Sequence, residues 1–212
     1  HLIYQQLFNF CAVDMGGFYL DIIKDRQYTV ATDNIARRSA QTAIWHILEA
    51  MVRWLAPILS YTAEEIWRHM PGERAESVFL TRFYDDLADY DPQYDAAFWA
   101  EINRVREEVN TALEAARKNG DIGGSLEAEL DITAPAATLA TLEHELRYVY
   151  IVSKVTLRAG DALAITVKKA QGEKCERCWH ILPTVNQNAA YPGLCPRCID
   201  NVAHGGEHRK YV

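Results

Sequence analysis

The sequence predicts an α+β fold that is mainly helical and ends in a small cysteine-rich module. Three observations lead to this prediction. Apolar residues recur at helical spacing through the first 70 residues, and residues 126–133 alternate apolar and polar side chains as a half-buried strand does. Four of the five cysteines form two CxxC pairs near the end of the chain. We therefore expect a helical bundle at 1–92, a small α/β unit with a short sheet at 93–170, and the cysteine module at 171–212.

Apolar stripes predict the first two helices of the bundle. The first stripe covers residues 3–22 and includes Cys11, which we expect to be a buried, unreactive thiol. The second covers residues 44–55, where Glu49 and Arg53 stand four residues apart and predict an ion pair on one helix face.

Capping residues and prolines predict where the helices of the bundle begin and end. Asp33 is the expected N-cap of the second helix, and Pro57 ends or kinks that helix. Thr62-Ala-Glu-Glu65 has the pattern of a capping box that opens a third helix. Pro71-Gly72 stops this helix, and the following residues up to 95 are expected to form a loop.

The middle of the chain predicts a long helix, a short helix and a small antiparallel or mixed sheet. Apolar positions between residues 98 and 116 mark the long helix, and Asn119-Gly120 predicts its C-terminal cap. Pro135 begins the short helix. The strands are expected at residues 126–133, 149–157 and 162–167.

Composition and charge limit the classes of function. The chain has 212 residues, of which 49% are hydrophobic and 24% charged, as in folded rather than disordered proteins. No apolar run approaches the ~18 residues of a membrane span, so we expect no membrane contact. The net charge of −7 argues against indiscriminate coating of nucleic acid, whereas residues 168–212 alone carry a net +3. Any contact with nucleic acid should therefore be local.

The two CxxC pairs predict a structural zinc site. Cys175 and Cys178 are separated from Cys195 and Cys198 by sixteen residues, a spacing that allows four thiolates to surround one tetrahedral Zn²⁺. Four cysteines close the coordination shell and leave no position for a catalytic water. One alternative is a redox CxxC, which leaves the second pair without a role. Another is His180 replacing one of the cysteines as ligand.

Basic and aromatic residues of the module predict contact with nucleic acid. Arg177 and Arg197 each occupy the third position of a CxxC pair, where they either contact phosphate or remain solvated and offset the charge of the zinc site. Trp179 either stacks on an unpaired base or packs over the zinc site. Arg209 and Lys210 either form a phosphate-binding tail or are disordered.

Arg37 and Arg38 predict a second basic site, in the first turn of a helix. Cations are disfavoured at the positive end of the helix dipole, which indicates either an external anion such as an RNA backbone or an ion pair within the bundle. The sequence contains no GxxxxGK[ST] loop, no GxGxxG after a strand, and no nucleophile with an evident base, so we predict no catalytic residue.

The residues named above resemble a known family. Four stretches of the bundle resemble the anticodon-binding helical domain of class I aminoacyl-tRNA synthetases for branched aliphatic amino acids: Tyr19–Arg26, Ala40-Gln41, Arg53–Leu59 and Thr62–Trp67. Three stretches resemble the region that follows in isoleucyl enzymes: Val105–Val109, Glu114–Arg117 and Ile122–Ala128. The cysteine module, with Cys178-Trp179 and the later Arg209-Lys210, is similar to the C-terminal zinc segment of bacterial isoleucyl-tRNA synthetases.

The resemblance implies a parent enzyme, a cytoplasmic and monomeric ligase that activates isoleucine with ATP and attaches it to tRNA. The HIGH and KMSKS signatures of its active site have no counterpart here. The chain is accordingly expected to be a piece without the upstream catalytic and editing domains, inactive alone, that binds the anticodon region of isoleucine tRNA. Two alternatives stay open: a zinc-tipped nucleic-acid-binding module of another protein, such as a DNA repair glycosylase, and a structural docking domain.

Overall fold

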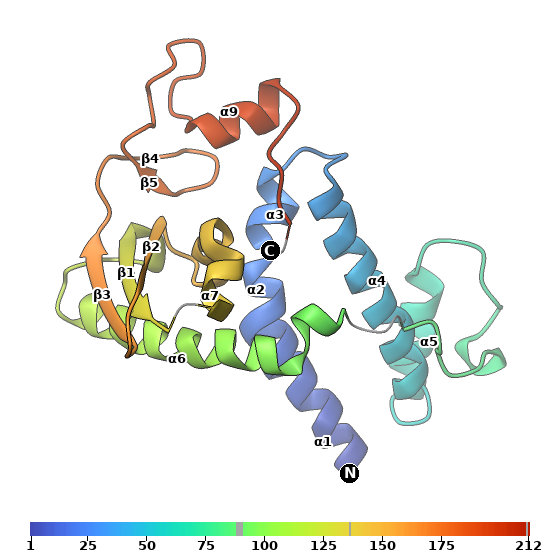
Figure 1. Ribbon diagram of the computed structural model, residues 1–212. Coiled ribbons are helices and arrows are strands. Elements are labelled where there is room, and N and C mark those ends of the chain that lie inside the picture. Colours follow the sequence, from blue (N-terminus) through green and yellow to red (C-terminus); the bar gives the residue numbers. More distant parts are fainter. Residues whose placement is uncertain (88–90, 136, 211) are drawn as a thin grey trace.

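The computed structural model describes residues 1–87, 91–135, 137–210 and 212, and it confirms the mainly helical α+β fold (Figure 1). None of the described helices is both long and apolar enough to cross a lipid bilayer. The α-helices and the π-helix η1 are α1 (Leu2–Asn9), η1 (Phe10–Tyr19), α2 (Leu20–Ile22), α3 (Lys24–Thr29), α4 (Ile35–Leu55), α5 (Ser60–His69), α6 (Ala96–Lys118), α7 (Ala137–Leu142), α8 (Leu146–Val149) and α9 (Pro196–Ala203). Short 3-10 turns are η2 (Val78–Leu80), η3 (Pro92–Tyr94), η4 (Ser125–Glu127) and η5 (Glu143–Glu145).

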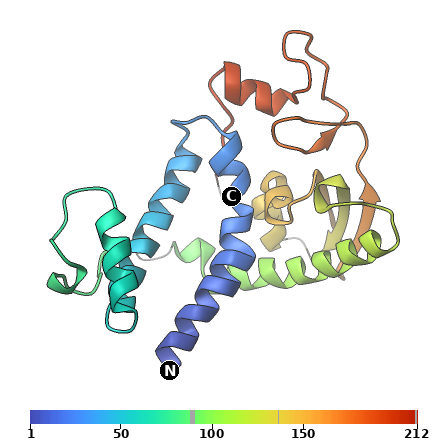
Figure 2. The same ribbon diagram turned by 180° about the vertical axis from the view of Figure 1, so that it is seen from behind.

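The N-terminal helix projects from the body of the molecule in both views (Figures 1 and 2). No residue of α1 or η1 is buried, so the prediction of a buried Cys11 is wrong: this thiol is exposed. The helix joins the body only near its end, where Phe18 packs edge-on against Trp99 of α6 with ring centroids 6.4 Å apart. The apolar stripe is therefore present as predicted, but along most of its length no described segment faces it.

Two predicted helix starts were misplaced, by one residue at α4 and by three residues at α5. Asn34, not Asp33, caps α4: its side-chain oxygen accepts from the backbone N–H of Ala36 at 2.9 Å. Helix α5 begins at Ser60, before the expected capping box, and has no side-chain cap. The tight turn after α4 returns the chain directly to helical geometry, since the backbone N–H of Leu59 already bonds to the carbonyl of Leu55 at 2.7 Å. The ends before Pro57 and Pro71 are confirmed.

A buried carboxylate holds α4 against the segment after α5. Glu49 accepts from Arg53 at 2.5 Å, which confirms the predicted pair, and from Arg74 at 2.6 Å. Both guanidinium groups also lie 4.8 Å from the ring centroid of Trp67. Burial raises the pKa of the Glu49 carboxyl, but hydrogen bonds from the two arginines outweigh this effect and leave the pKa below its usual value. These four side chains replace part of the apolar core in the outer half of the bundle.

The main core lies between α6 and the sheet. The five apolar residues on the inner face of α6 are buried as predicted: Ile102, Val105, Val109, Leu113 and Ala116. The predicted cap is also confirmed, because Asn119 is the C-cap residue of α6 and Gly120 has a φ of +80°, which glycine adopts without strain. Ile22, Ile23 and Ala40 of the bundle belong to the same core. This core crosses the boundary expected at residue 92, and the three-unit division stays a prediction.

The sheet is mixed, with strand order β2-β1-β3. The central strand β1 (Ala128–Ala134) is parallel to β2 (Lys154–Ala159) and antiparallel to β3 (Ala164–Lys169), and Leu130 lies between Val155 and Val167. Each strand starts later than predicted. The largest difference is at β2, because Val149 ends α8 and Ile151 adopts a left-handed φ of 55° before the strand can begin. Residues 88–90, within the predicted loop, lie outside the described residues.

We expect Glu49→Gln to lower the free energy of unfolding by about 3 kcal/mol at pH 7, because it leaves two largely buried guanidinium groups, with side chains 15% and 12% exposed, without a counter-charge. Since the native pKa of Glu49 is depressed, this difference should persist at neutral pH and shrink as the pH falls below about 4. Urea unfolding at both pH values measures it. Glu101→Gln, which breaks an exposed ion pair with Arg104, is the matched control and should change the stability little.

Candidate metal centre and nucleic-acid interface

The four predicted cysteine ligands converge at one point in the C-terminal module. Their Sγ atoms all lie within 4.8 Å of one another, and all four residues are buried. The sulfurs of Cys178 and Cys195 are 3.7 Å apart. Zn–S bonds of about 2.3 Å directed to the corners of a tetrahedron place the sulfurs ~3.8 Å apart, whereas a disulfide requires about 2.05 Å. The donor set and its spacing therefore fit one tetrahedral Zn²⁺.

Local backbone hydrogen bonds shape the two cysteine pairs. The first pair turns because the N–H of Trp179 bonds to the carbonyl of Cys175 at 2.9 Å. The hairpin of β4 (Glu173–Lys174) and β5 (Ile181–Leu182) carries this turn. The second pair opens α9, with Cys195 as N-cap and Pro196 at the first helical position. The positive end of the α9 dipole thus lies at the sulfurs, where it stabilises thiolates.

The thiols also polarise one another. Hydrogen bonds from the thiols of Cys178 and Cys198 lower the pKa of Cys195 to about 3. In addition, the backbone N–H of Cys195 approaches the sulfur of Cys175 at 3.4 Å. Both contacts favour the thiolate, which is the form of cysteine that binds metal.

His180 is buried but does not belong to the group of four clustered donors. Its ring instead packs edge-on against Tyr148, with centroids 6.0 Å apart, and its backbone carbonyl accepts from the N–H of Cys175 at 2.9 Å. His180 thus connects the metal site to α8. Ser153 makes a second connection, since its hydroxyl accepts from the N–H of Ile181 at 2.7 Å and donates to the carbonyl of Leu126 at 2.5 Å.

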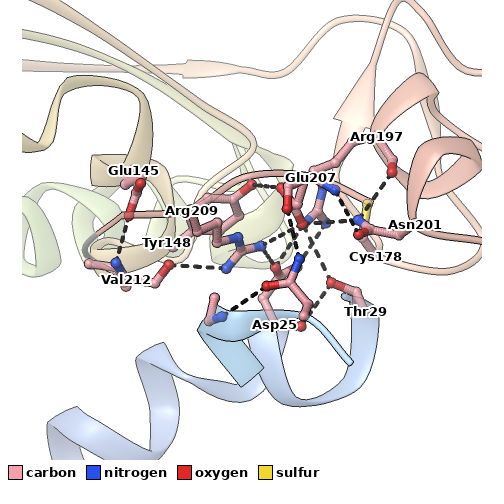
Figure 3. A network of polar contacts seen from close by, with 12 residues as sticks. Asp25, Thr29, Glu145, Tyr148, Cys178, Arg197, Asn201, Glu207, Arg209 and Val212 are labelled. Atoms are coloured by element: carbon pink, nitrogen blue, oxygen red, sulfur yellow. Dashed lines mark hydrogen bonds and ion pairs between the residues drawn. The ribbon is translucent and has the colours of Figure 1, made fainter. Parts of the chain in front are cut away.

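Arg197 and Arg209, two of the predicted RNA contacts, belong to an ion-pair network in which Arg209 is buried and the side chain of Arg197 is 10% exposed (Figure 3). Arg197 makes a bidentate pair with Asp25 of α3, at 2.8 and 2.9 Å, and also bonds to Glu207 at 2.9 Å. Arg209 binds the same two carboxylates and stacks on Tyr148, 3.6 Å from its ring centroid. Their contact with RNA stays a prediction, and burial favours a structural role that is neither of the alternatives considered from sequence.

Arg177 and Trp179 line a pocket between the cysteine module and the bundle. The pocket has a volume of about 480 Å³ and a mainly apolar surface. Trp179 is 58% exposed and Tyr28 of α3 is 78% exposed, and both belong to its walls. Arg177 also donates to the backbone carbonyl of Thr29. The Nζ of Lys174 lies 5.0 Å from the Trp179 ring centroid. Trp179 therefore does not form a miniature core over the zinc site.

The remaining predicted contacts are accessible but do not line this pocket. Arg38 and Lys210 are exposed and Arg37 is half-buried. Within the part of the chain that the structure describes, no ion pair joins Arg37 or Arg38 to a carboxylate. Both stand at the N-terminal end of α4, beside α3 and the cysteine module, while α5 lies at the other end (Figure 2). Their cationic groups are thus available at the edge of the interface.

Asp25, Tyr148 and Glu207 were not singled out from the sequence, although they organise the interface. Asp25 stands within the Tyr19–Arg26 stretch, whose resemblance to a known family was the available signal. Nothing in the sequence pairs it with arginines more than 170 residues away. Long-range pairing of charged residues follows from the fold and has no periodic pattern.

A comparison with known protein families identifies two parts of this chain. The anticodon-binding domain of tRNA ligases matches residues 1–132, more than half of the chain. The chain belongs to this family. The zinc finger found in FPG and IleRS matches residues 172–201, which include all four cysteines. The chain therefore carries a zinc finger, and together with the cysteine geometry this match identifies the metal as a single structural Zn²⁺.

Three relatives that match the whole chain are isoleucine–tRNA ligases. The chain is 58% identical to the enzyme of Dichelobacter nodosus over 216 aligned residues, covering 100% of the chain and 23% of the relative. It is 49% identical to the enzyme of Edwardsiella ictaluri and 50% identical to that of Yersinia enterocolitica, in each case over 100% of the chain and 24% of the relative. The chain thus spans about a quarter of the length of these relatives. A DNA repair glycosylase is not favoured, because the ligases match along the whole chain.

We expect removal of zinc to unfold the cysteine module and to leave the bundle and the sheet folded. The module has a small apolar core beside its cysteines, made of Val185 with the partly buried Leu182 and Leu194, so the metal supplies most of its stability. A strong chelator should expose the module to protease while most of the helical circular dichroism signal remains, since α9 has only 8 residues. A cooperative loss of the whole helical signal would contradict the prediction.

Proposed function

We propose that the chain is the tRNA-binding part of an isoleucine–tRNA ligase and holds the anticodon region of isoleucine tRNA. The family match and the names of the relatives support this proposal. In it, the parent enzyme activates isoleucine with ATP in an upstream catalytic domain, as a cytoplasmic monomer. The three units proposed from sequence serve as anticodon-binding bundle, junction and zinc module. No residue of this chain takes part in the chemistry.

The pocket between the bundle and the zinc finger is the observation that carries the proposal. Unpaired bases of RNA are held by stacking on aromatic rings, with cations nearby for the backbone. Trp179 and Tyr28 supply two accessible rings on opposite components of the interface, and Arg177 and Lys24 supply charge beside them. A mainly apolar pocket of about 480 Å³ accommodates the flat face of a base. A single base splayed from an anticodon loop fits this combination.

Phosphate contacts are proposed on the surface around the pocket. Arg37 and Arg38 lie in the first turn of α4, without an ion pair among the described residues, and Lys210 follows on the C-terminal segment. These cations contact the backbone on either side of the splayed base. Because the whole chain has a net charge of −7, we expect its affinity to come from these local contacts and to be modest without the parent enzyme.

Trp179→Ala should weaken binding of an isoleucine tRNA anticodon stem-loop by about 1–3 kcal/mol, roughly 5- to 150-fold in Kd, because one base loses its stacking partner. Fluorescence anisotropy of a labelled stem-loop measures the effect, and a stem-loop with a non-cognate anticodon tests specificity. Trp54→Ala is the matched control: this Trp is also exposed, at 37%, but stands at the far end of α4. Equal affinity of wild type and Trp179→Ala would favour the alternative that the zinc finger only docks.

Arg37→Gln combined with Arg38→Gln should reduce the salt dependence of binding. Each lost phosphate contact lowers the slope of log K against log salt by about 0.7 for single-stranded RNA. The double variant should therefore lose about 1.4 in slope. Arg104→Gln combined with Arg117→Gln removes the same charge from exposed positions of α6 and serves as the control. An equal change in both double variants would indicate a net-charge effect and no direct contact.

A further inference from the structure

We propose that Asp25 is the positioning residue that fixes the zinc finger on the bundle, so that zinc retention and docking of the C-terminal segment both depend on this one carboxylate. The inference goes beyond tRNA binding and concerns how the interface is assembled.

Both oxygens of Asp25 are occupied by the C-terminal part of the chain. Oδ1 accepts from Arg197 at 2.8 Å and from Arg209, and Oδ2 accepts from Arg197 at 2.9 Å (Figure 3). The side chains of the two arginines are 10% and 2% exposed. Charged groups this deeply buried are stable only when paired, and a bidentate guanidinium–carboxylate pair is the most directional form of such pairing. The position of α9 over α3 is therefore fixed at this carboxylate.

Arg197 connects this contact to the metal. It stands between Cys195 and Cys198, in the first turn of α9, so a shift of Arg197 moves the backbone that carries both sulfur ligands. Zinc holds that backbone from one side and Asp25 holds it from the other. Because the coupling is reciprocal, loosening the contact with Asp25 must weaken zinc binding by the same factor as zinc removal weakens docking.

Arg209 connects the same carboxylate to the described C-terminal segment, residues 204–210 and 212. The carbonyl of Glu207 in this segment accepts from the N-cap residue Asn34 at 2.7 Å, and its carboxylate accepts from Arg197. Glu145 accepts from the backbone N–H groups of residues 210 and 212, at 2.7 and 2.6 Å. The segment thus lies across α4, α3 and η5, with Asp25 beneath it.

Local charge makes Asp25 hard to replace. Arg26 is also buried, and burial together with the charge of Arg209 lowers its pKa. Without Asp25, Glu207 would be the one remaining carboxylate that the structure shows paired with Arg197 and Arg209. We therefore expect repulsion between these cations to open the interface when the carboxylate is neutralised, even by an isosteric amide.

The test is the rate of zinc release from the zinc-loaded chain to a chromophoric chelator, 4-(2-pyridylazo)resorcinol, together with limited trypsin digestion of the zinc finger. Asp25→Asn should accelerate release by about tenfold or more and expose the finger to cleavage, because a buried pair has lost one partner. Asp131→Asn is the matched control: it removes a carboxylate that pairs with Lys168 on the sheet surface, and it should leave both rates unchanged.

Arg209→Gln is the second variant, because it removes a partner of Asp25 without touching the bundle or the neighbours of the zinc ligands. It should also accelerate zinc release. In a chain that already carries Arg197→Gln and Arg209→Gln, adding Asp25→Asn should have no further effect, since the residues through which Asp25 acts are gone. Circular dichroism at 222 nm checks that the bundle stays folded in every variant.

Three results would overturn the proposal. One is zinc release from Asp25→Asn and Arg209→Gln at the wild-type rate. Another is an undiminished effect of Asp25→Asn in the double-glutamine background. The third is accelerated release accompanied by loss of the helical signal in both single variants, which would indicate general unfolding. None of these measurements uses RNA, so failure of the proposed tRNA binding would leave this test intact.

Discussion

The C-terminal part of the molecule depends on one constraint, the coordination of a single zinc ion by four cysteine thiolates. Val185 and the partly buried Leu182 and Leu194 give the module a small apolar core, too small to hold a hairpin of two-residue strands and a short helix in fixed positions. The metal replaces that missing core. Because Cys195 and Cys198 lie on either side of Arg197, the same coordination that folds the module also aims a guanidinium at the bundle.

The zinc finger and the bundle form the candidate binding pocket together. Neither component contains the pocket alone, since Tyr28 comes from α3 and Trp179 from the zinc finger. His180 and Ser153 connect the finger to α8 and the loop before β2, by one ring contact with Tyr148 and one hydrogen bond from the N–H of Ile181 to the Ser153 hydroxyl. The arginines of the interface differ in their pairing. Arg197 and Arg209, which hold the finger on the bundle, are paired with carboxylates. Arg37 and Arg38 are without an ion pair among the described residues.

Features set by local chemistry could be predicted from the sequence, and features set by long-range pairing could not. The CxxC spacing, the apolar face of α6 and the i,i+4 pair of Glu49 and Arg53 each depend on residues a few positions apart, and all were predicted. The exposure of Cys11 could not be inferred, because an apolar stripe indicates a preference for burial but not whether a neighbour is present. The roles of Arg197 and Arg209 depend on Asp25, which the sequence gives no means of pairing with them.

The ammonium of Lys174 beside the Trp179 ring has a consequence for how a ligand would enter. In the free protein this cation lies over part of an indole that is otherwise largely exposed to water, an attraction of roughly 0.5–1 kcal/mol at an exposed site. An incoming base must displace the ammonium, and the released charge is then close to the sugar–phosphate chain that accompanies the base. The lost attraction between the Lys174 ammonium and the Trp179 ring is thereby offset by a new attraction between the ammonium and a phosphate. A neutral aromatic molecule without a phosphate would lose the first attraction and would not gain the second.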